Sequence, residues 1–297
     1  MGINGFLNVN KPENKTSSFV VTQLKHFTGE KRVGHAGTLD PIATGVLPVC
    51  LGQATRIVQF LVDSSKTYLA QIELGIATET FDKEGEITFR QDPTGITQKQ
   101  IEEALTNFHG VVEQVPPKYS ALKYKGKRYY ELARAGIPIE LKPRQVNIIN
   151  IELVSFEPPF VTLTIKCGKG TYIRSLAHDL GQYLGCGAYL RNLTRTQYGP
   201  FDIATAISIT RIEDAIKQNT LNELIHSVDI PLLNWNAVTI SKDDESAVKN
   251  GCSIHLNKDG SISGEYCRAY DTEGHFIAVL RFIPEQKLWH PDKVFSL

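Results

Sequence analysis

The first fifty residues predict a strand, a helix and a long irregular loop. Apolar and polar side chains alternate over residues 5–10, which is typical of a half-buried strand. Apolar residues at helical spacing follow two serines and predict a helix over 17–27. Residues 30–48 hold several glycines and prolines, so we expect a loop there that leads into a short apolar strand at 46–51.

The middle of the chain mixes helices and strands. Residues 54–63 have a helical pattern, whereas 67–74 alternate and predict a strand paired with 86–89 across a turn at 82–85. Further helices are expected at 98–109, 172–184 and 209–217, and further strands at 145–154, 160–167 and 189–197. This order predicts an α+β fold with flanking helices on a mixed, mainly antiparallel sheet.

The pattern changes after Pro231. Short β-like runs at 237–240, 266–270 and 276–282 are separated by Gly, Asn and Asp, which favour turns. We therefore expect a boundary near 230–236, with one domain over 1–235 and a small β-rich domain over 236–297.

Length, composition and charge agree with two globular domains. The chain has 297 residues, of which 41% are hydrophobic and 22% charged, too many residues for one ordinary core of about 100–150. Thirty-two basic residues balance thirty-two acidic ones, so an anionic partner must meet a local patch. Residues 200–297 hold nine basic and fourteen acidic side chains, which leaves a basic surplus in the larger domain.

The cysteines and the hydropathy indicate the compartment. Five cysteines lie at least fifteen residues apart, which gives neither a metal-binding pair nor a disulfide framework, so we expect free, mostly buried thiols and no metal. The N-terminus lacks a secretory pattern, and no run of eighteen apolar residues occurs. We expect a cytoplasmic protein that does not enter a membrane.

Residues 118–144, called the basic insertion below, combine positive charge with aromatic side chains. They contain eight Lys or Arg against two Glu, with four tyrosines among them. Neutralisation of phosphates together with base stacking is what such a mixture offers RNA. The alternative is a solvated surface hairpin, because charge runs often only keep a face soluble.

The loop at 34–48 places Asp40 between glycines and prolines. Glycine permits close backbone approach and proline restricts φ, so the loop is suited to an acid presented rigidly at a cleft. An ordinary Asp-Pro turn is the alternative. Neither glycine-rich phosphate-binding pattern is present.

Several sequence blocks, in order, resemble one known family. Gly34-His35-Ala36-Gly37-Thr38-Leu39-Asp40-Pro41, with the residues as far as Pro48, resembles the catalytic motif of the bacterial TruB-type tRNA pseudouridine synthases. Further matching blocks lie at 11–12, 66–68, 116–121, 126–130, 133–136 and 170–176, so the resemblance covers about residues 5–200.

The resemblance implies roles for individual residues. It makes Asp40 the nucleophile, Arg174 its cationic partner, and Tyr68 the aromatic ring that stacks on a flipped-out uracil. It adds substrate contacts from His35, Tyr172 and Leu190. The basic insertion becomes an RNA-binding thumb whose candidate contacts are Lys123, Lys125, Lys127 and Arg128, and residues 236–297 become a PUA-like RNA-binding domain.

The implied reaction isomerises uridine 55 in the T loop of tRNA. It breaks the N1–C1′ bond, turns the base and rejoins it through C5, so no atoms are gained and no cofactor is implied. A carboxylate must be ionised to act as a nucleophile, and we expect the cation of Arg174 to lower the pKa of Asp40. Attack at C6, attack at C1′ and elimination through a glycal stay open. The implied partner is the T arm of tRNA, bound by a monomer that needs no protein partner.

Two other classes of function compete with this one. A metal-dependent phosphodiesterase would use His35, Asp40 and the adjacent His178 and Asp179. A noncatalytic RNA-binding protein or tRNA chaperone would use only the basic insertion and the C-terminal domain. Activity in the presence of a chelator excludes the first, and conversion of uridine excludes the second.

Overall fold

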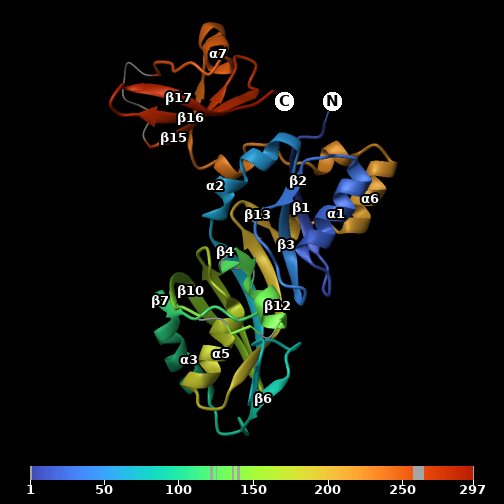
Figure 1. Ribbon diagram of the computed structural model, residues 1–297, viewed down its shortest axis with the longest axis vertical. Coiled ribbons are helices and arrows are strands. Elements are labelled where there is room, and N and C mark those ends of the chain that lie inside the picture. The colour runs from blue at the N-terminus through green and yellow to red at the C-terminus, as the bar shows by residue number, and fades with distance from the viewer. Residues whose placement is uncertain are drawn as a thin grey trace.

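The computed structural model consists of a long main sheet with helices and a smaller β domain at one end of it (Figure 1). The residues that the structure describes are 2–120, 123–124, 126–135, 137–138, 141–256 and 264–296.

The main sheet runs through both halves of the larger part. Its strands follow the order β1-β3-β12-β4-β11-β10-β7, with β12 parallel to β3 and the other neighbours along this path antiparallel. The short strands β2 (Val33–His35) and β13 (Phe201–Asp202) join β3 and β12. The bounds along the path are β1 Gly5–Lys11, β3 Ala43–Leu51, β12 Ala188–Tyr198, β4 Lys66–Leu74, β11 Phe160–Cys167, β10 Arg144–Glu157 and β7 Gly110–Gln114. The predicted α+β class is confirmed.

Helices pack against this sheet at its two ends (Figure 1). The helix α1 (Ser17–Thr28) begins where the Thr16 hydroxyl accepts a hydrogen bond from the amide of Phe19. The other helices of the larger part are α3 Gln98–Leu105, α4 Tyr129–Arg134, α5 Ile173–Tyr183 and α6 Ile209–Lys217. The helix expected at 54–63 is divided into a 3₁₀ turn, Gly52–Arg56, and the short helix α2, Val58–Val62.

The predicted partner of β4 is wrong. Strands β11 and β12 occupy the two edges of β4, whereas β6 (Ile87–Arg90) pairs with β5 (Ile76–Thr78). All four residues of β6 are exposed, so this strand has no apolar face to bury against β4. The two long strands bury apolar side chains along their whole length, which outweighs a local turn.

The C-terminal sheet has the order β14-β15-β16-β17 and confirms a small β domain. Its strands are β14 Asn236–Thr239, β15 Tyr266–Tyr270, β16 Phe276–Ile283 and β17 Leu288–Val294. The sequence reading missed β17 and the helix α7 (Lys242–Lys249), which the Ser241 hydroxyl caps. Phe276 and Phe295 pack in one apolar cluster with Phe6 and Ala54 of the larger part, so the two parts share buried surface.

The thiols agree with the sequence reading. All five cysteines are free, and all are buried except Cys252. In the described part of the chain, no helix has both the length and the apolar character to cross a membrane.

Candidate active site

A pocket of about 290 Å³ opens between the Asp40 loop and the start of α5. Asp40 lies on the loop between β2 and β3, Tyr68 on β4, and Arg174 in the first turn of α5. Tyr172, the residue before α5, also lines this pocket. Four of the residues that the family resemblance singles out therefore meet at one place.

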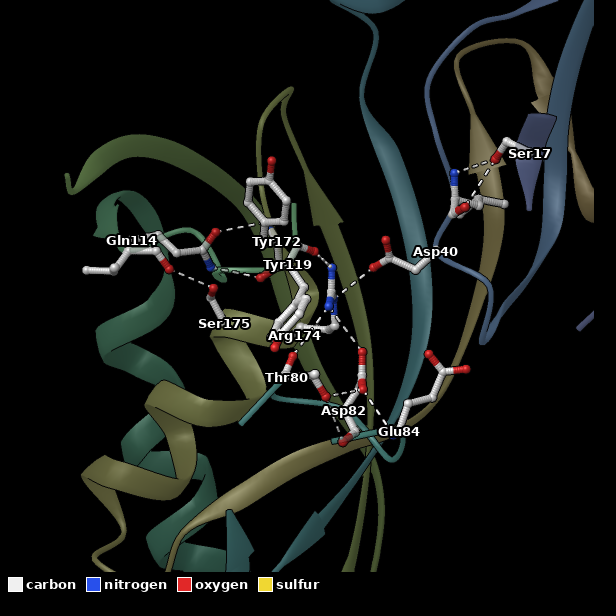
Figure 2. A network of polar contacts seen from close by, with 12 residues as sticks. Ser17, Asp40, Thr80, Asp82, Glu84, Gln114, Tyr119, Tyr172, Arg174 and Ser175 are labelled. Atoms are coloured by element: carbon white, nitrogen blue, oxygen red, sulfur yellow. Dashed lines mark hydrogen bonds and ion pairs between the residues drawn. The ribbon is translucent and has the colours of Figure 1, made fainter. Parts of the chain in front are cut away.

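The backbone around Asp40 is tied to its surroundings. The hydroxyl of Ser17 accepts a hydrogen bond from the amide of Leu39 at 2.9 Å and donates to the carbonyl of the same residue at 3.1 Å (Figure 2). Gly45, just beyond the loop, has φ +95°, and a Cβ there would lie 2.3 Å from the carbonyl oxygen of Arg195. The glycine therefore allows β3 and β12 to approach closely beside the site.

Arg174 lies between two carboxylates (Figure 2). Its Nε is 2.9 Å from Oδ2 of Asp40, and its Nη1 is 3.1 Å from Oδ2 of Asp82. Nη2 donates to the carbonyl of Tyr119 at 2.9 Å, and Nη1 to that of Thr80 at 3.3 Å. The side chains of Arg174 and Asp82 are 6% and 5% exposed, against 36% for Asp40. The buried pair thus orients the guanidinium toward the more accessible carboxylate.

Asp82 was not predicted as a site residue, because the sequence pattern placed it in a hairpin turn. Its carboxylate also accepts hydrogen bonds from the hydroxyl of Thr80 and the amide of Glu84. The local sequence is the same whether the turn aspartate is buried or exposed. Only the packing of α5 against the turn at residues 80–84, called the corner below, shows that Asp82 is buried.

The start of α5 is positioned by β7. The side-chain amide of Gln114 donates to the carbonyl of Tyr172 at 2.9 Å and accepts from the amide of the same residue at 2.8 Å (Figure 2). The hydroxyl of Ser175 donates to the carbonyl of Val115 at 2.7 Å. These contacts determine where Arg174 enters the pocket.

The pKa of Asp40 is raised from its ordinary value, because burial penalises the carboxylate. The predicted lowering of this pKa is therefore wrong: the guanidinium of Arg174 does lower it, but burial is the larger effect. Asp82 also raises it and the ammonium of Lys11 lowers it. Lys11 is itself fully buried, and burial lowers its pKa to about 8. The pKa of Asp40 is therefore set by burial and the nearby carboxylate, which raise it, and by the two nearby cations, which lower it.

The opposite wall of the pocket is aromatic and cationic. Tyr68 is 9% exposed and pairs across the sheet with Arg195. The guanidinium of Arg195 lies 4.9 Å from the ring centre of Tyr198, and the ammonium of Lys66 lies 4.5 Å from it. Burial raises the pKa of Tyr68, so its ring is uncharged at neutral pH.

Two expected contacts lie away from the pocket lining. His35 is half-buried on β2, where burial, together with the charge of Arg195, lowers its pKa. Leu190 is fully buried, whereas Leu193 of the same strand lines the pocket. A register shift in β12 between Leu190 and Asn192 places Leu193 beside Ala70 and nearer to Tyr68.

The basic insertion is described only in part. Its hairpin consists of β8 (Lys123–Tyr124) and β9 (Lys127–Arg128), followed by α4. Lys125 lies outside the residues that the structure describes. The RNA contacts expected from the side chains of this hairpin therefore stay a prediction.

The metal-site alternative has no support in the geometry. Within the described ranges, no group of three or more His, Cys, Asp or Glu is arranged to hold a metal ion. The ring of His178 stacks on Phe81 instead, 3.9 Å between centroids.

Two family models match the chain in succession. The N-terminal domain model of the TruB family pseudouridylate synthases matches residues 25–173, and that of the tRNA pseudouridylate synthase B C-terminal domain matches 174–232. The chain belongs to the TruB family. The resemblance read from the Asp40 motif is thereby confirmed.

Individual TruB relatives match over nearly the whole length. A tRNA pseudouridine synthase B of Dehalococcoides mccartyi is 44% identical, with 99% of this chain and 97% of the relative covered. One from Francisella philomiragia is 43% identical, with 95% and 92% covered. A chain in a crystal structure of a Cbf5-Nop10-Gar1 complex is 27% identical, with a TM-score of 0.75 and 98% and 85% coverage. Both the sequence similarity to these relatives and the structural similarity to the Cbf5 complex therefore extend through the C-terminal β domain.

Proposed function

We propose that this protein isomerises uridine 55 in the T loop of tRNA to pseudouridine, with Asp40 as the nucleophile. The observation that carries the proposal is the pairing of Asp40 with the buried guanidinium of Arg174 in a pocket that Tyr68 also lines. Membership of the TruB family and relatives named tRNA pseudouridine synthase B support the choice of reaction and of RNA.

The residues of the pocket match the steps of such a reaction. A uridine in a folded loop must leave its stack, which costs a few kcal/mol, and an aromatic ring replaces the lost contact. Tyr68 is suited to this role because its ring is uncharged and lines the pocket. Breaking N1–C1′ and forming C5–C1′ then requires an ionised Asp40, and Arg174 favours that form.

RNA binding is assigned to surfaces outside the pocket. The excess positive charge of the basic insertion suits a phosphate backbone, and the C-terminal β domain is assigned a PUA-like RNA-binding role. We further propose that the enzyme acts in the cytoplasm as a monomer, without a protein partner. The division of the chain into residues 1–235 and 236–297 belongs to the same proposal.

The decisive experiment replaces one carboxylate. Asp40→Asn is nearly isosteric, and we expect it to abolish tritium release from C5-labelled uridine in tRNA under single-turnover conditions. Binding of tRNA should survive, because most affinity comes from phosphate contacts elsewhere. The matched control is Asp243→Asn, an exposed aspartate of α7, which should release tritium at the wild-type rate.

Two results would contradict the proposal. Tritium release by a folded Asp40→Asn protein would remove Asp40 as the nucleophile. A wild-type protein that binds tRNA but leaves uridine 55 unchanged would support the noncatalytic alternative instead.

A further inference from the structure

Phe81, the residue before Asp82, has an unusual backbone conformation. Its φ is +64°, in the left-handed region where a bulky side chain is disfavoured. Of the described non-glycine residues, only Asn14, Asn219 and Lys287 share a positive φ. Glycine would adopt this conformation without strain. The aromatic side chain must therefore make a favourable contact that outweighs the cost of the strained backbone.

The ring of Phe81 has a defined partner. It stacks on the imidazole of His178, with 3.9 Å between ring centroids and 16° between ring planes. Burial lowers the pKa of His178, which favours the neutral imidazole in the stack. His178 and Arg174 lie on the same helix, α5, four residues apart, and such residues share one face.

Phe81 and Asp82, two neighbouring residues of the corner, thus both contact one face of α5. Arg174 contacts the carboxylate of Asp82, and His178 contacts the ring of Phe81. The carbonyl of Phe81 also accepts a hydrogen bond from the amide of Leu190, 2.9 Å away, which ties the corner to β12. The stack, the ion pair and this hydrogen bond together therefore oppose a shift of Asp82 along α5.

We propose that Phe81 and His178 are positioning residues, whose stack sets the place of Asp82 and, through Arg174, the orientation of Asp40. The inference rests on the proposed function, because its effect is read in pseudouridine formation. Neither residue lines the pocket, so their contribution passes through the carboxylate of Asp82 and the guanidinium.

The test separates positioning from stability. Phe81→Gly relieves the backbone strain and removes the stack, so we expect a folded protein whose single-turnover rate is about three- to tenfold lower. Its dissociation constant for tRNA should not change. His178→Ala should slow the reaction similarly, and His178→Phe, which retains a ring, should restore it. Lys287→Gly relieves the same strain in a distant turn and should react at the wild-type rate.

A double-mutant cycle tests the route. In an Asp82→Asn background, followed over hours, Phe81→Gly should cause no further loss, because the residue it positions has already been changed. An equal loss in both backgrounds would overturn the inference, as would a wild-type rate per folded Phe81→Gly molecule. A slower rate matched by weaker tRNA binding would also overturn it. A wild-type protein without activity would be seen first and would refute the proposed function itself.

Discussion

Replacing Arg174 by methionine tests the electrostatic balance of the pocket most directly. Methionine has a similar length and no charge, so the change removes both ion pairs and the two hydrogen bonds to the carbonyls of Thr80 and Tyr119. The fold around the helix start retains its other supports, including the contacts of Gln114 with Tyr172.

The two carboxylates contribute unequally to the expected loss of stability. Asp82 is 5% exposed, and removing the partner of a buried charge costs about 3–5 kcal/mol. Asp40 is 36% exposed, so solvent screens its pair with Arg174, which contributes at most about 1 kcal/mol. Arg174→Lys keeps the charge but cannot contact both carboxylates and both carbonyls, so we expect an intermediate loss of about 1.5–3 kcal/mol.

The sign of the pH dependence follows from the same contacts. Without the guanidinium of Arg174, a carboxylate left in the folded variant binds a proton more readily than the same carboxylate in the unfolded chain. Folding of the variant is therefore favoured as the pH falls. The pKa of Asp40 is already raised by burial in the wild type, so the window lies above its ordinary value. The stability deficit, which is the free energy of unfolding of the wild type minus that of Arg174→Met, should have its full value at pH 8 and be smaller at pH 5. It should change by at most about 1.4 kcal/mol per pH unit for each proton bound.

Urea unfolding at pH 8 and pH 5 measures both quantities, with wild type and Arg174→Lys as references. Single-turnover tritium release should be lost in Arg174→Met at both pH values. A deficit below about 1 kcal/mol at pH 8, or one that grows as the pH falls, would refute the assignment of Arg174 to a buried charge pair.

Two further predictions concern RNA binding and the close approach of β3 to β12. Neutralising four basic residues of the basic insertion together should weaken tRNA binding, and log K against log salt should flatten by about 0.7–0.9 per lost phosphate contact; an unchanged line would remove the insertion from the interface. Gly45→Ala should lower the free energy of unfolding by at least about 2 kcal/mol, since its Cβ meets the Arg195 carbonyl at 2.3 Å. Gly29→Ala, with φ +69° and no atom within 4 Å, is the control, and an equal loss there would contradict the contact argument. The four neutralised residues are Lys123, Lys125, Lys127 and Arg128.

Elements with a strong local period were predictable from the sequence. The helical spacing over 172–184 gives α5, Ile173–Tyr183, and the alternation at 67–74 gives β4, Lys66–Leu74. The partners of β4 were not predictable, because pairing depends on strands far along the chain that bury more apolar surface than the neighbouring hairpin.

The same distinction applies to the candidate site. The motif around Asp40 and the block around Arg174 are continuous in sequence, so both residues could be named before the structure was known. The role of Asp82 depends on contact with a helix some ninety residues away. Leu193 replaces Leu190 in the pocket lining because of a bulge in β12, and a bulge changes the alternation without a clear local signal.

The place of β12 in the main sheet has a consequence for the growing polypeptide on the ribosome. β3 and β4 follow each other closely in the chain, yet β12 separates them, and it ends at Tyr198. At about 5–20 residues per second, translation from the end of β4 to the end of β12 takes about 6–25 s. During that time the edge of β4 that faces β12 has no partner, and neither has the start of the corresponding edge of β3, at residues 43–45. The strand β2 covers only the end of that edge, at residues 49–51. Exposed edges recruit other strands. The nascent chain is therefore most prone to aggregation before β12 emerges, and the pocket is assembled only afterwards.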